Sequence, residues 1–256
     1  MVVIAILEIA ICVGLMIYLL KQKKGEKYSA GAVIKFLGFG ALALIIGVVV
    51  SILLNFDVKM FGDMNPILSG FLAAFLTAAV YEEVIKYIFF RLSLIKNKGA
   101  VNHLDVIIGA ALVGIGFTVA ENIEFAIGGS GNVFRALLPM HILFQLVMGY
   151  FYGKAKVTKK AFYHVLALVV PIVLHTIFDM PIICMMTVLG DIKVKELTEE
   201  NFTSLPYYNY FVPLIVAFVM VAVGMLAFFI VSLVNVGRWS KSGKKQELLT
   251  GENANN

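Results

Sequence analysis

Several acidic, basic and histidine side chains lie inside apolar stretches that are long enough to cross a bilayer. An ionisable group near the centre of a membrane costs at least about 2.5–3.5 kcal/mol, so such residues are functional candidates by default. Carboxylates and imidazoles are also the groups used for acid–base catalysis, metal ligation and proton relays. The members of this set are Glu82, Glu83, Lys86, Glu121, Glu124, His141, His175 and Asp179.

These residue types allow three kinds of chemistry. The adjacent carboxylates of Glu82 and Glu83 can share a proton, which makes one of them an acid and the other a base. Alternatively, His141, His175 and the carboxylate of Glu121 form the two-histidine-plus-acid ligand set of catalytic zinc sites, and a second glutamate is then the general base. A proton or ion relay would use the same groups. The residues by themselves leave all three open.

Helical spacing predicts which of these side chains share a face, because residues three or four apart are neighbours on a helix. Glu82 and Glu83 precede Lys86 by four and three residues, and Asp179 follows His175 by four. Both groupings therefore predict pairs on one helix face.

Small residues predict where the helices pack closely. Gly70, Ala74 and Ala78 continue at a spacing of four to Glu82, which predicts that Glu82 points into the bundle. In the predicted span 133–153, His141 and Gln145 share a face. The same span carries Gly149 and Gly153 in a GxxxG motif. The span with Glu121 carries Ala110, Gly114, Gly116 and Ala120.

The elements that position these residues are predicted membrane helices. The 256-residue chain is 61% hydrophobic and 14% charged, against about 45–50% and about 25% in soluble domains. This composition excludes a soluble domain, a disordered chain and a disulfide scaffold. Because a span needs about 20 apolar residues, the sequence predicts an all-α integral membrane protein with seven spans: 2–20, 32–54, 66–91, 106–128, 133–153, 161–184 and 207–236.

The distribution of basic residues predicts the orientation of the chain. The net charge is +5, and Lys and Arg concentrate in alternate connections, at 21–31, 91–105, 154–160 and after Arg238. By the positive-inside rule the N-terminus is outside and the C-terminus is cytoplasmic. The charge therefore indicates membrane topology and not a nucleic-acid partner. Residues 1–236 are the predicted membrane domain, and 237–256 a disordered cytoplasmic tail.

Four sequence blocks in the middle of the chain resemble known motifs. Signatures of other intramembrane proteases, such as HExxH and a GxGD aspartyl pair, are missing. Instead, the order and spacing of the four blocks resemble the PrsW family of intramembrane proteases, which is related to the CAAX prenyl endopeptidase and bacteriocin-processing superfamily. The resemblance runs from about 66 to 184, the predicted catalytic core. The blocks are EEVIK (Glu82–Lys86), GIGFTVAEN (Gly114–Asn122), RALLPMH (Arg135–His141) and HTIFD (His175–Asp179).

This resemblance implies hydrolysis of a peptide bond in a membrane-anchored substrate, such as the anti-sigma factor of a stress response, at a prokaryotic cytoplasmic membrane. It implies that Glu82 and Glu83 are the core catalytic acids. Glu121, His141 and His175 would complete the site. Lys86, Asn122 and Asp179 would support it, with Asp179 orienting His175. Both a glutamic and a metal-dependent mechanism, the latter with Zn2+, are compatible with these motifs.

Two other functions compete with proteolysis. A non-catalytic membrane scaffold could use the same polar cluster to hold its helices together. A proton-coupled transporter would use it as a relay, but the sequence has no internal repeat of the kind that builds transporter cores.

Overall fold

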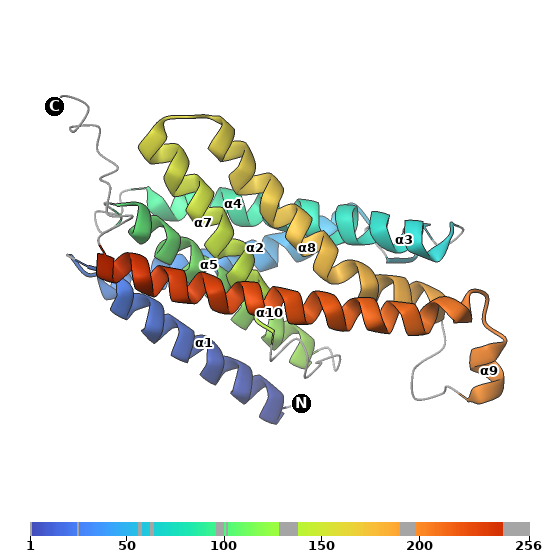
Figure 1. The fold of residues 1–256 in the computed structure, drawn as a ribbon. Coiled ribbons are helices and arrows are strands. Elements are labelled where there is room, and N and C mark those ends of the chain that lie inside the picture. Colours follow the sequence, from blue (N-terminus) through green and yellow to red (C-terminus); the bar gives the residue numbers. More distant parts are fainter. Residues whose placement is uncertain are drawn as a thin grey trace.

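The computed structural model describes residues 2–24, 26–55, 58–61, 64–95, 100, 102–127, 138–189 and 198–242. The regular elements in these ranges are helices, which confirms the predicted all-α class. Figure 1 shows long helices running side by side along the molecule. The helices are α1 (Val2–Gln22), α2 (Ala30–Leu53), α3 (Pro66–Leu72), α4 (Tyr81–Leu94), α5 (His103–Ile127), α7 (Met140–Thr158), α8 (Phe162–Leu189), α9 (Glu199–Thr203) and α10 (Phe211–Ser242), with the shorter or irregular η1 (Val58–Phe61), η2 (Ala73–Val80) and η4 (Tyr208–Tyr210).

Each of the seven predicted spans coincides with one of these helices or with the continuous run α3–η2–α4. Within the described residues, five helical stretches are long and apolar enough to cross a membrane: Ala30–Leu53, Pro66–Leu94, His103–Ile127, Phe162–Leu189 and Tyr208–Lys241. Helix α7 is less apolar because it carries His141, Gln145, Lys154 and Lys156. The count of seven spans and their orientation therefore stay predictions.

The two largest boundary differences from the sequence-based expectation are at the start of α7 and the end of α10. Helix α7 begins at Met140, because Pro139 disfavours helical backbone in the residue before it. Residues 133–137 of that predicted span lie outside the described ranges. Helix α10 continues to Ser242, beyond the boundary expected at 236, because the Ser240 hydroxyl donates to the Gln22 carbonyl of α1 at 2.6 Å. The rest of the tail, 243–256, also lies outside the described ranges.

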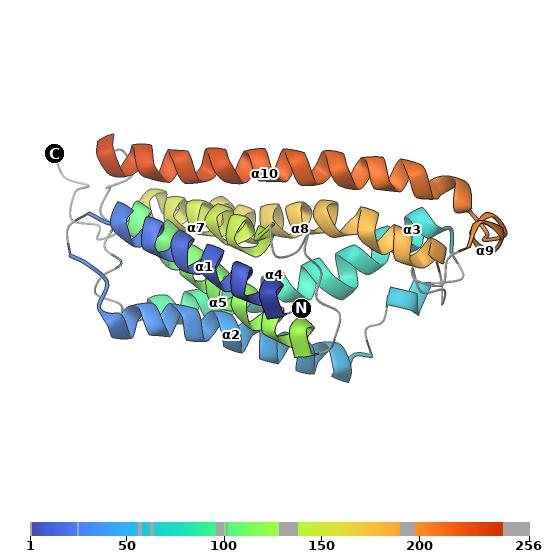
Figure 2. The ribbon, with the colours of Figure 1, turned by 90° about the horizontal axis from the view of Figure 1, so that it is seen from below.

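Helix α5 lies at the centre of the bundle and is buried along most of its length. Figure 2 shows α10 along one edge and α2 along the opposite edge, with α5 between α2 and α7. Glycines allow the close approach of these helices. A Cβ added to Gly116 would overlap the Leu37 backbone of α2, and one added to Gly114 would meet the His141 carbonyl of α7. The predicted close-packing surface of this span is thereby confirmed.

The run from Pro66 to Leu94 is not a uniform α-helix, because η2 in its middle is a π-helix. Its hydrogen bonds join residues five apart, so the four-residue spacing of the predicted small-residue row does not hold through it. Glu83, and not Glu82, is consequently the fully buried acid of the pair. Glu82 keeps 14% of its side chain exposed. Glu82 also reaches the interior of the bundle, where it contacts Lys86 at 3.0 Å, but Glu83 is the more deeply buried of the two.

Candidate active site

The five predicted catalytic residues form one hydrogen-bonded network, although they come from four helices. Helix α4 carries Glu82 and Glu83, α5 carries Glu121, α7 carries His141 and α8 carries His175. The contacts that join them run through Lys86, which binds both glutamates and His141. The network continues from His141 to Glu121 and from Glu83 to His175.

Glu83 is the most enclosed acid of this network, with a fully buried side chain. Its Oε1 atom lies 2.8 Å from Lys86 Nζ and 3.1 Å from His175 Nδ1. Its Oε2 atom accepts a hydrogen bond of 3.3 Å from Gln145 Nε2. These three partners compensate the burial of a carboxylate, which would otherwise be strongly unfavourable.

The ammonium group of Lys86 lies at the centre of the site. Besides Glu83, it contacts Glu82 Oε2 at 3.0 Å and His141 Nδ1 at 2.9 Å, and it sits 3.8 Å from the centroid of the Phe117 ring. An ammonium group only donates, so His141 Nδ1 accepts its hydrogen bond. The proton of His141 is then on Nε2, which donates to Glu121 Oε2 at 3.0 Å.

His175 has the same orientation as His141. Its Nδ1 atom faces Glu83, and its Nε2 atom lies 3.1 Å from Asp179 Oδ2. Each imidazole therefore presents Nδ1 to the centre of the site and Nε2 to a carboxylate. In metalloenzymes, a carboxylate on the second nitrogen orients a ligating histidine and makes it a better ligand.

Four residues could hold a metal ion together. Glu82, Glu83, His141 and His175 each offer a donor atom, and these atoms lie within 4.8 Å of one another. Nitrogen and carboxylate oxygen donors in this combination fit zinc. Glu121, the carboxylate expected as a third ligand, is not in this group; it binds the outer nitrogen of His141 instead.

Aromatic rings enclose the two imidazoles. The Phe144 ring is stacked on His175 with centroids 5.0 Å apart, and Phe117 meets His141 edge to face at 4.7 Å. Phe144 was not identified from the sequence, although its position three residues after His141 is a signal for a shared face. Gln145 was recognised as sharing that face but was given no role.

A cavity of about 20 Å³ lies beside the imidazoles, on the side of Glu121 and Asp179. This volume is enough for one water molecule. Thr118 and Asn122 also line the cavity, and in the described structure Thr118 Oγ1 and Asn122 Nδ2 are buried with no hydrogen-bond partner. An oxygen atom in the cavity would supply a partner for both.

The fold and the site together define a helical membrane protein that has the ligand chemistry of a metallopeptidase. Comparison with known families agrees. The chain belongs to the PrsW family, because residues 28–234 match the family described as PrsW family intramembrane metalloprotease. The resemblance drawn from the four sequence motifs is thereby confirmed.

Curated proteins named Protease PrsW are similar to this chain. The protein of Clostridioides difficile (strain 630) is 31% identical over 159 residues, 57% of this chain and 65% of that protein. Those of Geobacillus kaustophilus and Bacillus subtilis (strain 168) are each 35% identical, over 41% and 43% of this chain and 50% and 54% of theirs. The chain thus spans about half to two thirds of the length of these relatives. No solved structure matches it.

Proposed function

We propose that this chain is a membrane-embedded peptidase that hydrolyses a peptide bond in a membrane-anchored protein. The observation that carries the proposal is the shared orientation of His141 and His175, each with Nδ1 at the buried Glu83–Lys86 centre and Nε2 on a carboxylate. A scaffold needs polar groups that satisfy one another, but it does not need two imidazoles aimed at a common point. Membership of a metalloprotease family supports the same function.

We propose that the metal is Zn2+ and that His141, His175 and Glu83 hold it. The donor types suit zinc, and carboxylates on both outer nitrogens suit ligating histidines. Glu83 is the better ligand of the two adjacent acids because its side chain is fully buried and Gln145 Nε2 donates to its Oε2 atom at 3.3 Å. Zinc in such a site polarises a substrate carbonyl and lowers the pKa of water.

Glu82 is then the general base. Its carboxylate is bound to Lys86 but partly exposed, so a water molecule can reach it. Glu83 is thus a metal ligand because it is fully buried, and Glu82 is the base because it is partly exposed. It keeps Glu82 and Glu83 as the core catalytic pair, as the motif implies.

In this proposal Asn122 and Thr118 bind an oxygen atom that enters the cavity on the Glu121 and Asp179 side of the imidazoles. Both line the cavity beside the imidazoles, and among the described residues Thr118 Oγ1 and Asn122 Nδ2 have no hydrogen-bond partner. An amide N–H that meets the oxygen as negative charge develops would stabilise the transition state. Glu121 and Asp179 hold the outer nitrogens of the histidines and are positioning residues in this scheme.

Lys86 binds three of the four candidate metal ligands, which are Glu82, Glu83 and His141. Its ammonium group and a divalent cation would therefore compete for the same donor atoms. In this proposal Lys86 balances the charge of the acids when no metal is bound.

We further propose that the protein lies in a bacterial cytoplasmic membrane with its N-terminus outside, as the distribution of Lys and Arg predicts. An anti-sigma factor is the substrate class that the sequence motifs imply. It stays a prediction until a substrate is cleaved.

The test uses purified protein in liposomes with a single-span candidate substrate, and the variants Glu82→Gln, Glu83→Gln and His175→Ala. We expect wild-type cleavage, loss of cleavage in all three variants and about one zinc per chain by elemental analysis, with cleavage abolished by a chelator and restored by Zn2+. Glu124→Gln is the matched control, because Glu124 is an exposed carboxylate on the same helix as Glu121.

Undiminished cleavage in all three site variants would overturn the site assignment. Cleavage by metal-free protein would leave a peptidase but refute the zinc mechanism in favour of a glutamic one. A wild-type protein that cleaves no substrate but loses a bound partner on the same substitutions would be a scaffold.

A further inference from the structure

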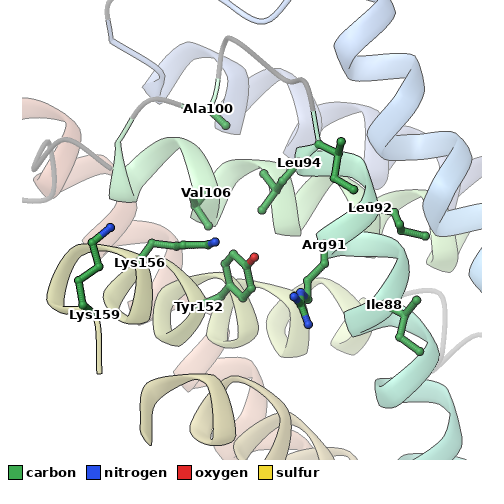
Figure 3. Close-up of a pocket in the computed structure, with 10 residues that line it drawn as sticks. Ile88, Arg91, Leu92, Leu94, Ala100, Val106, Tyr152, Lys156 and Lys159 are labelled. Carbon is green, nitrogen blue, oxygen red and sulfur yellow. The ribbon is translucent and has the colours of Figure 1, made fainter. Parts of the chain in front are cut away.

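A second pocket lies where three helices end, away from the candidate active site. It is formed by the C-terminal ends of α4 and α7 and the N-terminal part of α5, and its volume is about 650 Å³. Figure 3 shows the Arg91 and Lys156 side chains reaching from α4 and α7 toward the ring of Tyr152. None of the residues of the proposed catalytic mechanism lines this pocket.

The polar wall of the pocket is cationic. Arg91, Lys156 and Lys159 line it, all three are exposed, and none of its described lining residues is acidic. Lys156 Nζ lies 5.4 Å from the centroid of the Tyr152 ring, and the Arg91 guanidinium lies 5.7 Å from that of Tyr87. The aromatic rings thus hold the long side chains at the pocket, where they can bind an anion together.

The other wall is apolar and open. Ile88 and Leu92 of α4 keep 48% and 40% of their surface exposed, and Ile95 keeps 55%. Ile88 and Leu92 belong to the stretch Pro66–Leu94, which is long and apolar enough to cross a membrane, and Ile95 follows directly after it. Cationic groups at the end of such a stretch can bind the phosphate of a lipid headgroup. The exposed aliphatic side chains beside them can contact the acyl chains of the same lipid.

We propose that this pocket binds the headgroup of an anionic phospholipid. The phosphate binds Arg91, Lys156 and Lys159, and an acyl chain lies along Ile88 and Leu92. A free phosphate ion would use the cations but leave the aliphatic wall exposed. An acidic protein segment would have to place its polar backbone against a membrane-facing helix, where its N–H and C=O groups would lack partners.

The site does not depend on the proposed peptidase activity, because it uses different residues of the fold. It shares helices α4, α5 and α7 with the catalytic network but none of its residues, and Arg91 lies five residues beyond Lys86. Binding can therefore be measured on intact protein in which no substrate is cleaved.

The experiment measures lipid retention by native mass spectrometry of the full-length protein, after addition of phosphatidylglycerol or phosphatidylcholine. We expect wild-type protein to retain phosphatidylglycerol preferentially. Since each basic residue near the surface contributes on the scale of a few-fold in affinity, the triple variant Arg91→Gln/Lys156→Gln/Lys159→Gln should bind it roughly 10- to 100-fold more weakly. The double variant Lys156→Gln/Lys159→Gln, which keeps Arg91 beside Tyr87, should lose part of this affinity.

The matched control is Lys21→Gln/Lys160→Gln/Lys241→Gln, which removes the same charge from three exposed lysines outside the pocket. Equal retention of the two lipids by the wild type, or equal losses in the pocket and control variants, would overturn the proposal. So would displacement of the lipid by millimolar inorganic phosphate or by a poly-glutamate peptide, because either result would identify a site for a soluble anion.

Discussion

The imidazole rings of His141 and His175 lie edge to face with their centroids 5.2 Å apart and an interplanar angle of 77°. They come from two helices, α7 and α8, and each ring has a carboxylate on its Nε2 atom. Two neighbouring imidazoles held in this way leave their Nδ1 atoms facing Glu83 and Lys86.

Asp179→Ala should weaken zinc binding by about 10- to 100-fold, because the variant removes the carboxylate that orients His175. The measurement is competition with a chelator of known affinity. Glu121→Ala should act in the same way through His141. Glu124→Ala is the control on α5. If both positioning variants bind zinc as tightly as the control, the histidines are not oriented by these acids.

Lys86→Met should destabilise metal-free protein by about 3–5 kcal/mol, because it leaves the buried carboxylate of Glu83 without its cation. Added Zn2+ should recover most of this loss, since the ion supplies positive charge at the same donors. Thermal unfolding in detergent, with chelator or with zinc, measures both effects. A variant that is as stable as wild type in chelator would contradict the charge-balancing role of Lys86.

Asn122→Ala should lower kcat by about 10²–10³-fold if its amide donates to the reacting oxygen. The melting temperature should not fall, because Asn122 Nδ2 has no hydrogen-bond partner to lose in the described structure. The two readouts are single-turnover cleavage and thermal unfolding. A lower melting temperature with unchanged kcat would make Asn122 a structural residue.

Gly116→Ala should destabilise the protein by about 1–3 kcal/mol or more, since its Cβ would overlap the Leu37 backbone where α2 crosses α5. Gly38→Ala is the matched control, because a Cβ at Gly38 meets nothing within 4 Å. Detergent unfolding curves compare the two. Equal stability of both variants would mean that the crossing can widen without cost.

Lys23→Met should cost about 3 kcal/mol or more, because Lys23 Nζ forms a buried ion pair of 2.7 Å with Asp105 Oδ1. Adding Asp105→Asn to this variant should recover much of the loss, since no unpaired charge is then buried. A double-mutant cycle on the free energy of unfolding measures the coupling. Additive losses would show that the pair does not stabilise the contact between the α1–α2 connection and α5.

The sequence by itself determined the residue types of the site and the contacts within single helices. The pairs Glu83–Lys86 and His175–Asp179 were predicted from spacings of three and four, and the structure confirms both. The apolar runs determined the positions of the helices, because a span of hydrophobic residues is a local property of the chain. The four motifs were also sufficient to identify the PrsW family.

Only the tertiary structure decided which acid is buried and which residues meet between helices. The π-helical segment η2 places Glu83, and not Glu82, in the core, and no spacing rule for a regular α-helix reveals it. The position of Glu121 behind His141 and the buried pair Lys23–Asp105 likewise depend on how glycines let α5 approach its neighbours. Hydrogen bonding within a helix is set by nearby residues, whereas contacts between helices depend on the packing of the whole bundle.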